Sequence, residues 1–191
     1  MAKNIGYLTS GRTVESDEVY TPEYVVYAIE KFIRGNKSFT KILCPFDKDV
    51  HAFPTVLRKL GYQVINTHFN PQTGEGKNFF DYTKEDMVRM DIRYIISNPP
   101  FSIKDDVLRH CEELDVPYAL LLPLPTLQSN RRFQDVFSRG KTQVLIFDKR
   151  IPYSTRTKTW QEMSGNHFAS IFICKNVLPQ PLVFDELIVR K

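Results

Sequence analysis

The sequence predicts a single α/β domain in which short strands alternate with helices. Runs rich in β-branched apolar residues alternate with amphipathic segments, which is the pattern of βαβ units. The chain has 191 residues, 42% of them hydrophobic and 25% charged, as is usual for a globular domain with its own core. We therefore expect residues 1–191 to form one domain, without a separate domain for target recognition.

The expected elements follow from apolar spacing and from the residues that flank each segment. Thr21-Pro22 would supply an N-cap and a first-turn proline for the first helix. Thr83 with Asp86 resembles a capping box, and Ser102 would cap a later helix. Helices are expected at 24–33, 50–60, a short segment opened by 83–86, 102–114 and 127–137. Strands are expected at 42–44, 63–66, 94–97, 118–122, 144–147 and 168–174, and a long exposed loop at 152–166.

Composition argues against several classes of protein. The longest apolar stretch, residues 118–124, is far shorter than the ~20 residues that cross a bilayer, and no apolar signal segment opens the chain. Cys44, Cys111 and Cys174 have no metal-ligand spacing, so we expect reduced thiols, no metal and a cytoplasmic location. With 26 basic and 22 acidic residues, the net charge of +4 does not by itself imply nucleic acid.

The most specific motif is Asn98-Pro99-Pro100-Phe101, which follows a predicted buried strand. A rigid turn would be the alternative, but chance gives such a string in well under ~1% of chains of this length. The Asn98 side chain and the Pro99 backbone each offer a carbonyl, and Pro100 keeps Pro99 extended. Two acceptors aimed at a planar amine make its nitrogen pyramidal and therefore nucleophilic. Phe101 offers a face on which an extruded base can stack. The motif therefore predicts methylation of a planar amine.

With its flanking elements, this motif resembles that of S-adenosylmethionine-dependent N6-adenine DNA methyltransferases, most of all the EcoRI class and its small phage or prophage relatives. The resemblance extends from Tyr20-Thr21-Pro22 to the predicted strand around Ser170. It implies a Rossmann-like methyltransferase fold, with a mostly parallel sheet, an antiparallel late strand and helices on both faces. It also implies methyl transfer from S-adenosylmethionine to N6 of a flipped adenine in DNA.

The resemblance implies a cofactor site in which this chain departs from the family. A Thr-Pro pair at the head of an early helix helps to hold the methionine end of the cofactor, which here implicates Thr21 and Pro22, next to Tyr20. The usual glycine-rich turn after the first strand is replaced by the glycine-free stretch Cys44-Pro45-Phe46-Asp47-Lys48-Asp49. The backbone can then approach the cofactor less closely. Asp47 and Asp49 would accept hydrogen bonds from the ammonium or the ribose, or would form a solvated acidic loop.

Two further cofactor contacts are implied with altered residues. Where the family places an acidic residue on the ribose, this chain has Asn66-Thr67-His68, and His68 would bind the ribose or be a partly buried loop histidine. Where the family has an Asp-Phe pair on the adenine, this chain has Asn78-Phe79-Phe80-Asp81. Asn78 or Asp81 would bond the adenine while Phe79 packs on it. His51, His110 and His167 show no partner pattern that suggests catalysis or a metal.

A basic strip between residues 131 and 158 has eight basic and two acidic residues, or a net charge of +6. It would suit DNA phosphates beside a base pocket, although a solvated surface is as frequent a meaning of such a run. Its basic residues are Arg131, Arg132, Arg139, Lys141, Lys149, Arg150, Arg156 and Lys158. Specificity would come from loops such as 152–166, from a homodimer or partner protein, or would be low.

Two other functions remain open at this stage. Asn-Pro-Pro-aromatic strings also occur in enzymes that methylate RNA bases or a protein glutamine amide, because both amines are planar. The glycine-free loop leaves room for a methyltransferase fold kept as a binding protein without turnover, although such a protein would have no reason to keep the motif.

Overall fold

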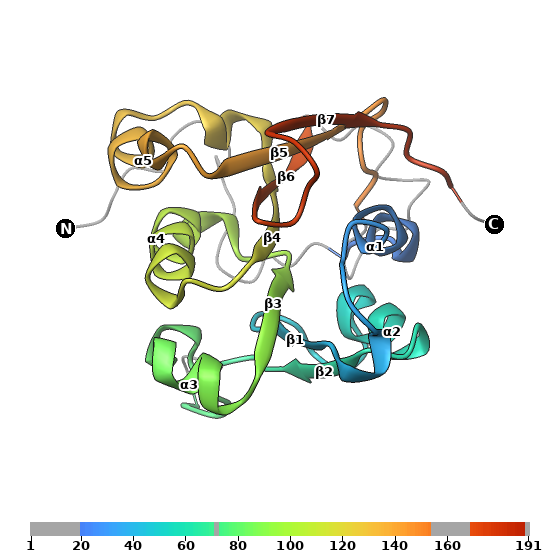
Figure 1. Ribbon diagram of the computed structural model, residues 1–191, viewed down its shortest axis with the longest axis vertical. Helices are drawn as coiled ribbons and strands as arrows, with labels where there is room; N and C mark the ends of the chain where they lie inside the picture. The colour runs from blue at the N-terminus through green and yellow to red at the C-terminus, as the bar shows by residue number, and fades with distance from the viewer. Residues whose placement is uncertain (1–19, 71–72, 154–168, 190–191) are drawn as a thin grey trace.

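The computed structural model describes residues 20–70, 73–153 and 169–189, and its centre is a seven-stranded sheet (Figure 1). The strand order is β2-β1-β3-β4-β6-β5-β7. The strands are β1 (Lys41–Cys44), β2 (Gln63–Asn66), β3 (Ile92–Ser97), β4 (Tyr118–Pro123), β5 (Thr142–Phe147), β6 (Ser170–Lys175) and β7 (Leu182–Asp185). Among them only β6 is antiparallel to its neighbours, β4 and β5. The predicted fold class, including the antiparallel late strand, is therefore confirmed.

Helices cover both faces of the sheet (Figure 1). On one face lie α1 (Glu23–Glu30) and α2 (Ala52–Lys59); on the other lie α3 (Lys84–Arg89), α4 (Lys104–Leu114) and α5 (Asn130–Asp135). Strand β4 shows how one sequence serves both cores, because Ala119 and Leu121 join the cluster under α1 and α2, and Leu120 and Leu122 join the cluster under α4. Alternate side chains of a strand point to opposite faces, so a strand buried on both sides is apolar throughout.

Some predicted boundaries are wrong for identifiable reasons. Pro22, not Thr21, is the N-cap of α1, and a proline side chain has no acceptor with which to cap a helix. The Thr21 hydroxyl instead accepts a hydrogen bond from Asn98. Ser102 does not cap α4, since a 3₁₀ turn, η4 (Phe101–Ile103), comes first and Ile103 is the N-cap. The capping box of Thr83 and Asp86 is confirmed.

Other differences concern the later part of the chain. The helix expected at 127–137 is divided into η5 (Leu124–Leu127), α5 and η6 (Phe137–Arg139), and Ser129 caps α5. Strand β7 was not expected, because it has only three consecutive apolar residues and these are not all buried. Most of the expected loop 152–166, with Arg156 and Lys158, lies outside the described residues, and so does His167. Among the described residues no helix is long and apolar enough to cross a membrane.

The parallel strands determine which edge of the sheet is expected to bind ligands. Because β1, β3 and β4 are parallel, their carboxyl ends lie at one edge of the sheet. The segments that leave this edge are residues 45–51, 98–103 and 124–129. In open α/β sheets this is the edge where ligands bind.

Candidate functional site

The side-chain amide of Asn98 is held in one orientation where β3 ends. Its Nδ2 donates a hydrogen bond to Thr21 Oγ1, at 3.2 Å, although the two residues are 77 positions apart. Its Oδ1 is buried and has no hydrogen-bond partner among the described residues. A buried carbonyl oxygen without a donor is costly, by about 1–3 kcal/mol, and in a native protein it usually has a purpose. Thr21 thus leaves the Asn98 oxygen available to an amine.

The end of the motif leads into a 3₁₀ turn, η4. Pro100 is extended, with φ −56° and ψ 127°, so the helical turn begins at Phe101 and the Pro99 carbonyl stays outside it. Phe101 is half-buried and packs against the apolar cluster under α4. Lys104 Nζ donates to the Phe101 carbonyl at 3.1 Å, which closes the turn.

Asp47 connects the loop after β1 to the motif after β3. The residue is only 3% exposed, and its Oδ2 accepts a hydrogen bond from Ser97 Oγ at 2.5 Å. Its backbone carbonyl accepts from Asn66 Nδ2 at 3.1 Å, and Thr67 Oγ1 donates to the Pro45 carbonyl at 3.1 Å. The glycine-free loop is therefore shaped by side-chain hydrogen bonds from the ends of β2 and β3.

His51 lies among the predicted cofactor residues, although its sequence context does not predict this position. It is the N-cap of α2, four residues after Asp47, and its Nδ1 accepts a hydrogen bond from the Lys48 N–H at 3.2 Å. Its ring stands edge-on to Tyr20, with centroids 5.6 Å apart, and 6.5 Å from the ring of His68. Three of the predicted cofactor residues thus surround it. The only sequence signal was its spacing from Asp47, because Tyr20 and His68 are distant in the chain.

An aromatic cluster lies on the other side of the same loop. Phe46 contacts Phe79 edge-on, with centroids 5.1 Å apart, and Phe79 contacts His110 at 4.9 Å. His110 Nε2 lies 3.1 Å from the Phe79 carbonyl oxygen, and a carbonyl only accepts, so the ring donates there and fixes η3 (Phe79–Asp81). Asn78 Oδ1 is used to cap this turn, while Asp81 is exposed.

Two predicted cofactor residues have side chains with other roles. Asp49 has a side chain that is 80% exposed, and it pairs with Arg58 at 2.9 Å. Cys44 is buried, and burial, followed by the nearby Asp47 carboxylate, raises the pKa of its thiol well above the usual range. The thiol therefore stays neutral and is part of the core. Pro22 and Pro45 are buried beside the site.

Arg132 is not a phosphate ligand, and the prediction that it belongs to a DNA-binding strip is wrong. Its guanidinium donates to the carbonyls of Thr126 and Gln128, at 2.6 and 3.1 Å, and to Asp105 at 2.7 Å. All three partners lie within the protein, and only 11% of the Arg132 side chain is exposed. The residue fastens the segment after β4 to the first turn of α4, just beyond Phe101.

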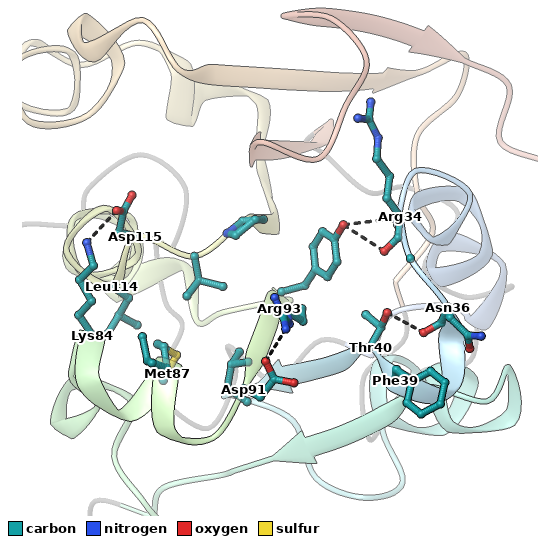
Figure 2. Close-up of a pocket in the computed structure, with 16 residues that line it drawn as sticks. Arg34, Asn36, Phe39, Thr40, Lys84, Met87, Asp91, Arg93, Leu114 and Asp115 are labelled. Atoms are coloured by element: carbon teal, nitrogen blue, oxygen red, sulfur yellow. Dashed lines mark hydrogen bonds and ion pairs between the residues drawn. The ribbon is translucent and has the colours of Figure 1, made fainter.

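A cavity of about 820 Å³ lies at the opposite edge of the sheet (Figure 2). Its lining includes Thr40, Ile92 and Pro117, at the amino ends of β1, β3 and β4. Tyr94 also lines it, and the Tyr94 hydroxyl accepts from the Arg34 N–H at 3.1 Å and donates to the Arg34 carbonyl at 3.3 Å. This cavity is separated from Asn98 by the length of the strands and contains none of the predicted site residues.

Comparison with known proteins supports the fold. No protein-family model matches this sequence, and no curated protein matches it. The chain is similar to a modification subunit of a putative type I restriction enzyme from Vibrio vulnificus YJ016, with a TM-score of 0.57 and 12% identity. The match covers 94% of this chain and 49% of that subunit, so this chain spans about half of its length.

Two further solved structures are similar at lower scores. One is a putative class I S-adenosylmethionine-dependent methyltransferase from Listeria monocytogenes, with a TM-score of 0.44 and 15% identity over 94% of this chain and 68% of that one. The other is a release-factor-specific protein-(glutamine-N5) methyltransferase from Alicyclobacillus acidocaldarius, with a TM-score of 0.42 and 15% identity over 80% of this chain and 90% of that one. The strand order and the antiparallel β6 give this chain the Rossmann-like methyltransferase fold.

Proposed function

We propose that this protein transfers a methyl group from S-adenosylmethionine to the N6 amine of adenine in DNA. The observation that carries the proposal is the buried Oδ1 of Asn98, which has no partner among the described residues while Nδ2 is held by Thr21. An acceptor fixed in this way, next to the Pro99 carbonyl, is complementary to the two hydrogens of a planar amine.

The chain's own residues then have defined tasks. Asn98 Oδ1 and the Pro99 carbonyl accept from the two amine hydrogens and draw the nitrogen out of conjugation, so that its lone pair points away from the ring. Phe101 stacks on the base once it has left the duplex. No strong general base is needed, because the amine becomes acidic when it forms the new C–N bond and its proton then passes to water.

The residues around the β1 loop fit S-adenosylmethionine. When bound, this cofactor supplies an electrophilic methyl group on sulfur. Asp47 offers a buried carboxylate for an ammonium group, and Phe46 with Phe79 offers an apolar aromatic wall for a purine. Tyr20 and His68 flank the His51 ring on the opposite side of the loop, and the pair Thr21-Pro22 lies beside Asn98. The hydrogen-bonded loop performs the positioning that a glycine-rich turn performs elsewhere.

DNA is the favoured substrate on two observations. The Vibrio vulnificus chain of similar fold is a modification subunit of a putative type I restriction enzyme. In the described part of the basic strip, Arg139 and Lys141 are exposed on the segment between α5 and β5. Arg131 pairs with Asp135 at 3.6 Å, a weak exposed contact that a phosphate can displace.

Transfer of labelled methyl from S-adenosylmethionine tests this proposal. Wild-type protein is given duplex DNA, RNA of the same sequence and a glutamine-containing peptide, and the product is identified by mass. We expect label in DNA as N6-methyladenine. Label only in RNA or only in the peptide would show that the substrate is a planar amine other than adenine in DNA. Binding of the cofactor without transfer to any substrate would contradict an enzymatic role.

A further inference from the structure

His51 has a proton that the fold leaves without an acceptor. The backbone N–H of Lys48 points at His51 Nδ1, with 3.2 Å between the nitrogens. A backbone amide always has its hydrogen, so Nδ1 is the unprotonated nitrogen of the neutral ring and the ring proton is on Nε2. The contact from Nδ1 to Asp47 Oδ1, at 3.4 Å, is longer than an ordinary hydrogen bond and does not change this assignment.

The Nε2–H group is buried and unsatisfied. It has no hydrogen-bond partner among the described residues, and only 16% of the His51 side chain is exposed to solvent. His51 is therefore a hydrogen-bond donor at Nε2, and a buried donor without an acceptor points to a ligand.

The neighbours of His51 indicate the chemistry of that ligand. Asp47 is a buried carboxylate whose Oδ2 accepts from Ser97, while Oδ1 keeps free lone pairs. A negative acceptor and a donor side by side are complementary to a group with both an ammonium and a carboxylate. The α-amino acid end of S-adenosylmethionine is such a zwitterion, whereas its adenosine end has no full charge.

The site is connected to the reacting atoms by a short path. Ser97, which binds Asp47, directly precedes Asn98. The amino acid arm of the cofactor is only a few bonds long, so its charged end must lie near the methyl group and hence near Asn98. The adenine is at the end of a longer arm, and the aromatic pair Phe46 and Phe79 lies on the other side of Asp47.

We propose that His51 Nε2 donates a hydrogen bond to the carboxylate of S-adenosylmethionine, in place of the backbone N–H groups that a glycine-rich loop would offer. This inference rests on the cofactor assignment of the proposed function. It explains how a loop without glycine retains a donor at this position: an imidazole reaches across a gap that the backbone cannot close. His51 is thus a residue that selects cofactors with a free carboxylate.

Calorimetric titration with two cofactors tests the inference, because S-adenosylmethionine and its decarboxylated form differ only in that carboxylate. His51→Asn keeps an acceptor for the Lys48 N–H but loses the Nε2 donor, and His51→Gln places an amide N–H near the same point. We expect His51→Asn to weaken binding of S-adenosylmethionine by about tenfold to a hundredfold and to leave binding of the decarboxylated form unchanged. His51→Gln should keep most of the wild-type affinity.

The controls separate this inference from the function on which it rests. Thermal unfolding of each variant checks the fold, and Arg34→Ala, at the opposite edge of the sheet, should bind both cofactors as the wild type does. Equal losses for both cofactors in His51→Asn, or no loss for either, would overturn the role of His51 while leaving the cofactor assignment intact. If wild-type protein binds neither cofactor, the cofactor assignment itself is wrong.

Discussion

The loops that follow β3 and β1 reach the same edge of the sheet, but they are built in different ways. The β3 loop is a contiguous motif, Asn98 to Phe101, whose backbone is set by two prolines. The β1 loop has no glycine and owes its shape to Asp47, which receives hydrogen bonds from Ser97 and Asn66. A contiguous motif is visible in the sequence, whereas a network made of distant residues appears only after folding.

The largest expected effect concerns the β3 loop. Asn98→Ala removes an acceptor that acts mostly in the transition state, so kcat for DNA methylation should fall by about 10²–10³ with little change in cofactor affinity. Steady-state methylation and calorimetry measure the two quantities. The control is Asn130→Ala, an exposed asparagine that opens α5, which should behave as wild type. An unchanged rate in Asn98→Ala would show that the β3 loop does not provide the acceptor for the methylated amine.

The next largest effect concerns the hydrogen bond from Ser97 to Asp47, which connects the β3 and β1 loops. Ser97→Ala leaves the buried Asp47 carboxylate without its short hydrogen bond. The free energy of unfolding should fall by about 1–3 kcal/mol, as measured by urea denaturation. Ser170 provides a matched control, because it is also a buried strand serine, and its Oγ is not part of the Asp47 network. Equal stability of Ser97→Ala and wild type would show that the loops are independent.

The aromatic residue of the motif has a smaller effect, on substrate capture. Phe101→Ala should weaken binding of target DNA by about 1–3 kcal/mol if the ring stacks on the extruded base. The loss should shrink on a substrate whose target adenine is mismatched, because flipping is then easier. Fluorescence anisotropy with matched and mismatched duplexes measures both. The same loss on both duplexes would argue for a packing role.

The smallest expected effect distinguishes the exposed basic residues Arg139 and Lys141 from the largely buried Arg132. Arg139→Ala with Lys141→Ala should reduce the log–log salt slope of DNA binding by roughly 1.8, or about 0.9 per phosphate contact, and leave stability nearly unchanged. Arg132→Ala should leave the slope unchanged and lower the free energy of unfolding by about 1–3 kcal/mol, because Thr126, Gln128 and Asp105 lose their donor. A reduced salt slope with unchanged stability in Arg132→Ala would show that Arg132 contacts a DNA phosphate.

The sequence was informative where the physics is local. Strands β3, β4 and β6 are built around continuous apolar runs, at 94–96, 118–123 and 171–174, and were predicted within a few residues. The capping box at Thr83 depends on residues three positions apart. Thr21 and Arg132 were misread because each looked like a local feature, a cap or a surface charge. Their true partners, Asn98 and Asp105, are set by the packing of helices and loops at the edge of the sheet.

The bond between Thr21 and Asn98 is the central claim, because it fixes which atom of the amide faces the substrate. A double-mutant cycle of Thr21→Val and Asn98→Ala, read as kcat for adenine methylation, tests it most directly. Thr21→Val should lower kcat by about tenfold in the wild-type background, since the amide loses its anchor, and Thr21→Ser should not. In the Asn98→Ala background Thr21→Val should have no further effect. If Thr21→Val lowers kcat by the same factor in both backgrounds, Thr21 does not act through Asn98 and the account is contradicted.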